Sequence, residues 1–236
     1  MNNSQQMLMA LEEQDLEKAD QYFYKALEQD SSEVLYELAS YLEGIGFYPQ
    51  AKEIYLKIAE DFPEVHLNLA AIASEDGQME EAFAYLEEIQ ADSDWYVSAL
   101  ALKADLYQME GLSDVAREKL IEALNYSDDP LLIFGLAELD SELENYQEAI
   151  QGYAQLDNRL IYEQTGISTY QRIGFAYAQL GKFEVAIEFL EKALELEYDD
   201  HTAYELASLY FDQEEYQKAV LYFKQIDTIS PDFEGY

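Results

Sequence analysis

Two histidines and two acidic runs are the parts of this sequence that most resemble catalytic or metal-binding groups. His66 and His201 each stand near the expected start of a helix, where we interpret them as helix-start residues rather than ligands. The acidic runs, at residues 92–96 and 197–201, could hold a cation, but carboxylates at turns usually cap helices. No glycine-rich phosphate loop, paired-histidine motif or calcium-binding loop occurs. We therefore predict a non-enzymatic protein with no catalytic residue, no metal site and no cofactor.

The charge of the chain excludes further classes of function. Its 236 residues include 13 Lys and Arg against 50 Asp and Glu, which gives a net charge of −37. Such a field repels nucleic acids and anionic lipid surfaces. There is no cysteine, no amino-terminal secretion signal and no apolar run long enough to span a bilayer. We therefore predict a cytoplasmic protein that binds neither nucleic acid nor membrane.

The elements that position these residues follow a repeat. An alanine recurs every 31 to 37 residues in similar short segments, such as PQAKEIY and QEAIQGY. The alanines are Ala19, Ala51, Ala82, Ala116, Ala149, Ala186 and Ala219. A large apolar residue stands four positions after each alanine, so the two residues share one face of a helix. The residue three positions before each alanine is expected to lie on the same face.

A second set of small residues lies twelve positions before each alanine, except in the first repeat, which has Met7 there. The set is Ala39, Ala70, Ala104, Ala137, Gly174 and Ala207. Small residues at both positions allow two helices of one repeat to approach closely. Four repeats carry glycine five positions before the alanine, where a turn between two helices is expected. The pattern thus predicts fourteen helices, arranged in pairs.

These positions strongly resemble the tetratricopeptide repeat, in seven copies that cover nearly all of residues 5–230. The resemblance implies an all-α fold, an α-solenoid of antiparallel helix pairs stacked in a right-handed superhelix. It also implies a single domain over residues 1–236, and we interpret the chain as bacterial. The expected repeats are about 4–31, 32–62, 63–94, 95–129, 130–166, 167–199 and 200–230.

Residues 231–236 resemble the start of an eighth repeat, because Phe233 and Tyr236 are placed like its opening turn. We interpret the chain as the amino-terminal part of a longer array, and a short natural tail is the alternative. The step from Ala149 to Ala186 is the longest, at 37 residues, and its segment contains Arg159 and Arg172. A local anion contact or a hinge would fit this segment, but we favour ordinary variation in repeat length.

The resemblance further implies that the first helix of each pair lines a concave groove that takes peptides. The predicted groove residues are Tyr36, Glu37, Ser40, Asn68, Asp105, Phe134, Glu138, Gln171, Arg172, Phe175, Tyr204, Glu205 and Ser208. Heat-shock chaperone adaptors of this family hold a terminal carboxylate with lysines and asparagines. Here only Asn68 and Arg172 resemble such donors, so we do not expect that specialisation.

The acids and aromatic residues of this set predict a protein or peptide partner with basic and apolar side chains. The plainer interpretation is that the groove is acidic because the whole protein is acidic. The predicted function is a protein–protein interaction scaffold or adaptor. The alternatives are a sensor of short signalling peptides and the interaction domain of a longer protein with an effector domain beyond residue 236.

Overall fold

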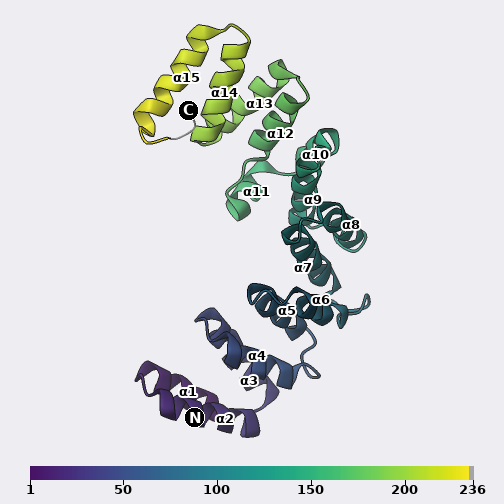
Figure 1. Ribbon diagram of the computed structural model, residues 1–236, viewed down its shortest axis with the longest axis vertical. Coiled ribbons are helices and arrows are strands. Elements are labelled where there is room, and N and C mark those ends of the chain that lie inside the picture. Colours follow the sequence, from purple (N-terminus) through teal and green to yellow (C-terminus); the bar gives the residue numbers. More distant parts are fainter. Residues whose placement is uncertain (234–236) are drawn as a thin grey trace. The chain divides into compact units, whose positions relative to one another are not determined.

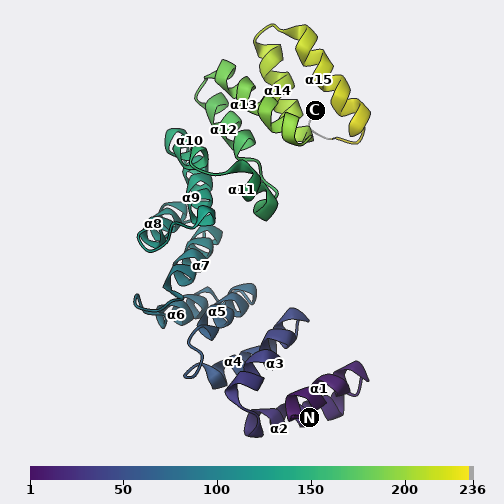
Figure 2. The same cartoon turned by 180° about the vertical axis from the view of Figure 1, so that it is seen from behind.

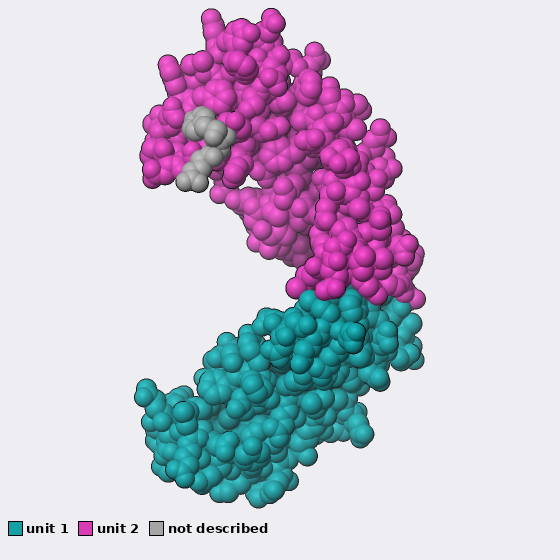
Figure 3. All heavy atoms as spheres, in the orientation of Figure 1, with its two compact units in different colours: residues 1–106 teal, residues 107–236 magenta. Residues whose placement is uncertain are grey.

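The computed structural model describes residues 1–233, and all regular structure in that part is helical. The chain divides into two compact units, residues 1–106 and 107–236 (Figure 3). The first range contains α1 (Asn3–Glu12), α2 (Leu16–Gln29), α3 (Ser32–Gly44), α4 (Tyr48–Ile58), α5 (Val65–Glu75), α6 (Met79–Glu87) and most of α7 (Tyr96–Met109). Along the described residues, no helix has the length and apolar character needed to cross a bilayer.

The second range contains eight further helices. They are α8 (Ser113–Ala123), α9 (Pro130–Glu142), α10 (Tyr146–Ala154), α11 (Asn158–Thr165), α12 (Thr169–Gln179), α13 (Phe183–Leu196), α14 (Asp200–Asp212) and α15 (Tyr216–Ile229). Fourteen helices were predicted, and this count is wrong, because residues 1–233 form fifteen. The additional helix is α11, and it accounts for the long step between Ala149 and Ala186.

Consecutive helices lie side by side in pairs within each unit (Figures 1 and 2). In the first unit α1 pairs with α2, α3 with α4, and α5 with α6. In the second unit α9 pairs with α10, α12 with α13, and α14 with α15. The predicted all-α repeat fold is confirmed. That one solenoid continues through both units stays a prediction.

The small residues of the repeat are buried where the helices of a pair meet. All seven alanines of the first set are at most 3% exposed. A Cβ added to Gly174 on α12 would lie 2.6 Å from Cδ2 of Leu190 on α13, so these helices approach too closely for a side chain there. Three of the seven residues that lie three positions before the alanines depart from the expected stripe, because Leu16, Phe183 and Tyr216 are exposed.

The turns between paired helices use a left-handed residue in every repeat. Gly46, Gly77, Gly111 and Gly181 have φ values between 69° and 83°, as the glycine pattern predicted. The other three repeats place Gln14, Glu144 and Glu214 there, with φ values of 59°, 62° and 62°. A side chain with a Cβ is disfavoured in this conformation by about 1–2 kcal/mol. The turn geometry of the repeat therefore outweighs the preference of the individual residue.

This strain predicts that Gln14→Gly stabilises the protein. We expect the free energy of unfolding to rise by about 0.5–1 kcal/mol, because relief of the left-handed strain exceeds the entropy cost of glycine. Urea unfolding measures the change. The control is Glu12→Gly, which places glycine in the regular last turn of α1 and should cost up to about 1 kcal/mol. Equal effects of the two substitutions would show that the left-handed turn is not strained.

The proposed opening turn of an eighth repeat, at residues 231–236, lies partly outside the described residues, and Tyr236 is among those not described. Phe233 is described, and its ring centroid lies 5.2 Å from that of His201 and 5.9 Å from that of Tyr204, both on α14. Phe233 thus covers the beginning of α14.

Candidate binding surfaces

Every predicted groove residue lies on the first helix of a pair. Those of the first unit lie on α3, α5 and α7, and those of the second unit on α9, α12 and α14. Their surroundings differ greatly, however. Some contact residues of the neighbouring repeat, some are exposed, and one is in the core. The sequence pattern assigned all of them to one surface because it records only the position on the helix.

In the first unit, Glu43 of α3 connects two repeats. Its Oε2 accepts hydrogen bonds from the Tyr55 hydroxyl of α4 at 2.6 Å and from Nδ2 of Asn68 on α5 at 2.9 Å. Burial raises the pKa of the Tyr55 hydroxyl, and the hydrogen bond to Glu43 raises it further. Asn68 is therefore engaged with a carboxylate of its own chain.

In the second unit, Glu138 of α9 plays the same part. It accepts a hydrogen bond from the Tyr153 hydroxyl of α10, and it forms an ion pair with Arg172 of α12. Nε of Arg172 lies 2.9 Å from Oε1 of Glu138, without the alignment of a hydrogen bond. Burial raises the pKa of Tyr153, and the charge of Glu138 adds to the shift.

The tyrosines and the nitrogen donors of the two clusters occupy matching places in their repeats, whereas the glutamates do not, because Glu43 lies eight residues before Ala51 and Glu138 eleven before Ala149. Asn68 and Arg172 each stand fourteen positions before the repeat alanine, at Ala82 and Ala186. Both direct their nitrogen atoms to a glutamate of the preceding repeat. These two residues are the donors that most resembled a carboxylate-binding clamp. Asn68 already donates a hydrogen bond to an internal carboxylate, and Arg172 already neutralises one.

Two other predicted groove residues also have structural contacts. Phe134 is 7% exposed and its ring centroid lies 5.9 Å from that of Tyr153, so its prediction as a groove aromatic is wrong. It faces the core because α9 packs against α10 at this position. Nε2 of Gln171 donates to Oδ2 of Asp199 at 2.9 Å and to Oγ1 of Thr202 at 2.6 Å, which joins α12 to the start of α14.

The remaining predicted residues of the first unit, on α3 and α7, are more accessible. Glu37 and Ser40 on α3 are exposed, and Asp105 on α7 is exposed as well. Tyr36 is half-buried, and its ring centroid lies 5.2 Å from that of Phe62. An aromatic ring beside exposed acidic and hydroxyl groups can contact an apolar side chain and attract a cation.

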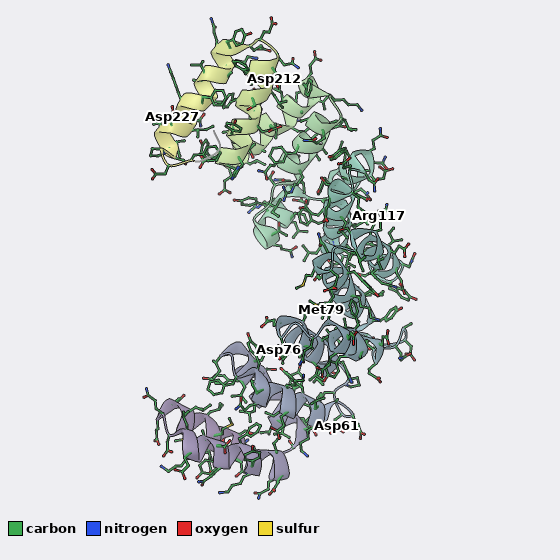
Figure 4. All side chains as sticks on the ribbon, in the orientation of Figure 1. Asp61, Asp76, Met79, Arg117, Asp212 and Asp227 are labelled. Carbon is green, nitrogen blue, oxygen red and sulfur yellow. The ribbon has the colours of Figure 1, made fainter. Side chains whose placement is uncertain are left out.

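In the second unit, a shallow cleft of about 380 Å³ crosses the first helices of three successive pairs. Its lining residues are Ser141, Tyr146, Phe175, Ala176, Gln179 and Glu205. Burial raises the pKa of the Glu205 carboxyl, and the negative charge of Asp212 at the end of α14 raises it further (Figure 4). A positive group bound in the cleft would therefore offset an unfavourable negative charge.

Tyr204 and Ser208, the last two predicted residues, lie on α14. The Tyr204 ring contacts Phe223 of α15 at a centroid distance of 5.8 Å. The hydroxyl of Ser208 donates to the backbone carbonyl oxygen of Tyr204 at 2.9 Å. Both side chains are half-buried, so each retains some surface for a partner.

The histidines occupy the helix starts that the sequence predicted. The Nδ1 atom of His66 lies 2.8 Å from the backbone carbonyl oxygen of Pro63, and His201 is the second residue of α14. Over residues 1–233, no three His, Cys, Asp or Glu side chains are grouped closely enough to hold a metal ion.

Paired helices, small residues at their contacts and left-handed turns define a helical repeat protein. Family models described as "Tetratricopeptide repeat" match residues 36–96, 167–200 and 201–233, and a model described as "YpiA-like, tetratricopeptide repeats" matches residues 108–159. The chain belongs to the tetratricopeptide repeat family. It is 36% identical over 126 residues to the TPR repeat-containing protein YpiA of Bacillus subtilis (strain 168), which corresponds to 53% of this chain and 30% of YpiA. The chain thus covers less than a third of that relative.

Solved structures show the same fold at low sequence identity. A crystal structure of MamA has a TM-score of 0.57 and 18% identity, and the match covers 66% of this chain and 91% of MamA. A tetratricopeptide repeat protein from Parabacteroides merdae has a TM-score of 0.56 and 19% identity, over 99% of this chain and 93% of its own. The APC/C hetero-tetramer Cut9–Hcn1 has a TM-score of 0.58 and 16% identity, over 90% of this chain and 43% of that one.

Two kinds of structural role were not predicted from the sequence. Glu43, Tyr55 and Tyr153 hold neighbouring helices together, and a tyrosine four positions after the repeat alanine was the available signal for two of them. The residues around α11 were missed because the long repeat step was interpreted as ordinary variation. Its 37-residue length was the signal that an additional element is present.

Proposed function

We propose that the chain is a scaffold that binds a protein segment with basic and apolar side chains on its first-helix surfaces. Tetratricopeptide repeats generally mediate protein–protein interactions, which supports a binding role. The observation that carries the finer proposal is the cleft of the second unit. It combines the Phe175 ring with Glu205, a carboxylate whose raised pKa reflects burial and a neighbouring negative charge.

The first unit offers a similar combination in Tyr36, Glu37 and Ser40 on α3. On both surfaces the carboxylates attract a basic segment over a distance, and the aromatic rings hold it after contact. Asn68, Glu138 and Arg172 support these surfaces by joining adjacent repeats. They are therefore unsuitable as direct contacts for a partner.

The experiment is to capture partners with the full chain and then measure association and dissociation rates over a salt series. Glu37→Gln with Glu205→Gln should slow association and flatten its salt dependence, because the change removes long-range attraction. Tyr36→Ala with Phe175→Ala should speed dissociation about tenfold or more and leave the salt dependence nearly unchanged.

The matched control replaces Glu53 and Glu188 with glutamine. These residues are exposed on α4 and α13, the second helices of pairs, so the variant carries the same change in net charge on other surfaces. It should bind like the parent. If both first-helix variants also bind like the parent, the partner uses a different surface and the proposal is wrong.

A further inference from the structure

The additional helix α11 forms one wall of a pocket in the second unit. The pocket has a volume of about 450 Å³, and its other walls are the start of α12, the end of α13 and the start of α14. The family matches on either side end at residue 159 and resume at residue 167. Most of α11 thus lies between them.

The pocket is predominantly negative. Glu163 of α11, Glu197 at the end of α13 and Asp199 before α14 line it, together with one cation, Arg159. Nε of Arg159 lies 2.9 Å from Oε1 of Glu163, but the Arg159 side chain is 87% exposed and the Glu163 side chain 59% exposed. A pair this exposed is weak, so a bound cation can compete with Arg159 for Glu163.

The other two carboxylates have different surroundings. Oδ2 of Asp199 accepts hydrogen bonds from the Thr202 backbone N–H at 2.7 Å and from Gln171 at 2.9 Å, so its role is to start α14. Glu197 is exposed and accepts a hydrogen bond from the Tyr162 hydroxyl, which raises the pKa of Tyr162. Glu163 and Glu197 are therefore the carboxylates best placed to meet a ligand.

The pocket also has an apolar side. Leu196 lines it and is 62% exposed, and the side chains of Tyr162 and Tyr198 are among its lining residues. Carboxylates beside aromatic and aliphatic groups favour a cation that is itself flat and partly apolar. A guanidinium group fits this description, because it stacks on aromatic rings and forms paired hydrogen bonds to carboxylates.

We propose that this pocket binds an arginine side chain of a partner protein. The arginine stem contacts Leu196 and the tyrosines, and its guanidinium group lies between Glu163 and Glu197. Gln171 of α12, a predicted groove residue, also lines this pocket, but the pocket carboxylates Glu163 and Glu197 differ from Glu37 and Glu205 of the proposed first-helix surfaces. The two proposals can therefore be tested separately. In this proposal, the role of α11 is to form one wall of a recognition pocket in the second unit.

The test uses capped amino acids in place of the unidentified partner. Amide NMR spectra of the full chain are recorded with N-acetyl-arginine amide at 150 mM salt, where exposed charges are screened beyond about 8 Å. We expect shifts concentrated in residues 158–168 and 193–202. N-acetyl-citrulline amide has the same shape without the charge and should bind at least about tenfold more weakly. N-acetyl-lysine amide should also bind more weakly, because it cannot stack as a plane.

The variant that removes the site is Glu163→Gln with Glu197→Gln, and arginine binding should weaken at least about tenfold. The matched control is Glu184→Gln with Glu188→Gln, which removes two exposed charges from α13 outside the pocket and should bind as the parent does. Melting temperatures of both variants verify folding.

Three results would overturn the proposal. The first is equal binding of arginine and citrulline amides, and this comparison uses the unaltered chain, so it does not depend on any variant folding. The second is an effect of arginine spread over the acidic surface instead of residues 158–168 and 193–202. The third is equal loss of binding in the pocket variant and in the control.

Discussion

Gly174→Ala is expected to lower the free energy of unfolding by about 1–3 kcal/mol, the range for adding atoms to a well-packed core. The added Cβ would lie 2.6 Å from Cδ2, 2.7 Å from Cγ and 3.2 Å from the backbone N of Leu190. The Leu190 side chain is fully buried, so it has no room to move aside. Relief requires α12 and α13 to separate.

Because the helices of a repeat contact mainly their neighbours, the loosening should be local. Hydrogen exchange should accelerate chiefly in α12 and α13 and much less in α1 to α4. The matched control is Gly44→Ala in the last turn of α3, where an added Cβ meets nothing within 4 Å. This change should leave stability unchanged or raise it by up to about 1 kcal/mol. Equal melting temperatures for the two variants would contradict close packing at Gly174.

The second large effect is expected for Arg117→Met. Arg117 of α8 forms an ion pair with Asp140 of α9 at 2.5 Å from Nε to Oδ1, and the Asp140 side chain is only 5% exposed (Figure 4). Loss of the cation leaves a buried carboxylate without its counter-charge. Breaking a buried pair typically costs 3–5 kcal/mol, and the 30% exposure of Arg117 reduces this to about 2–3 kcal/mol.

Urea unfolding measures this cost, and Lys119→Met on the same helix is the control. Lys119 pairs with Glu122 at 2.9 Å, and both side chains are about one-third exposed, so its loss should cost less than about 1 kcal/mol. Adding Asp140→Leu to Arg117→Met should recover much of the stability, because it removes the uncompensated charge. Failure to recover it would indicate that Arg117 acts through packing alone.

The fold could be predicted from the sequence because its signals are local and repeated. Ala186 and the equivalent alanines each indicate close packing between the two helices of one repeat. Because the same residue type recurs in all seven copies, the pattern can be recognised without knowing the structure. The turns were predicted for the same reason: the left-handed position lies five residues before each alanine, and four of the seven copies show glycine there.

The candidate site was less predictable, because position on a helix does not reveal what a side chain contacts. The sequence placed Asn68, Phe134 and Arg172 on one surface from their spacing. The structure pairs Asn68 with Glu43 and Arg172 with Glu138, and it buries Phe134 against Tyr153. These outcomes depend on distances of a few ångströms between neighbouring helices, which the repeat spacing does not specify.

By itself, the sequence determined the repeat family, the helix pairing, the left-handed turns and the strongly acidic character of the chain. These properties depend on residue types at regular intervals and on summed charge. The tertiary structure decided which polar groups join adjacent repeats, which aromatic residues face the core, and that residues 158–165 form α11 and wall a pocket. The physical reason is that hydrogen bonds, ion pairs and cavities are set by the close approach of side chains from different helices, whereas helix formation and pairing follow from patterns within each repeat.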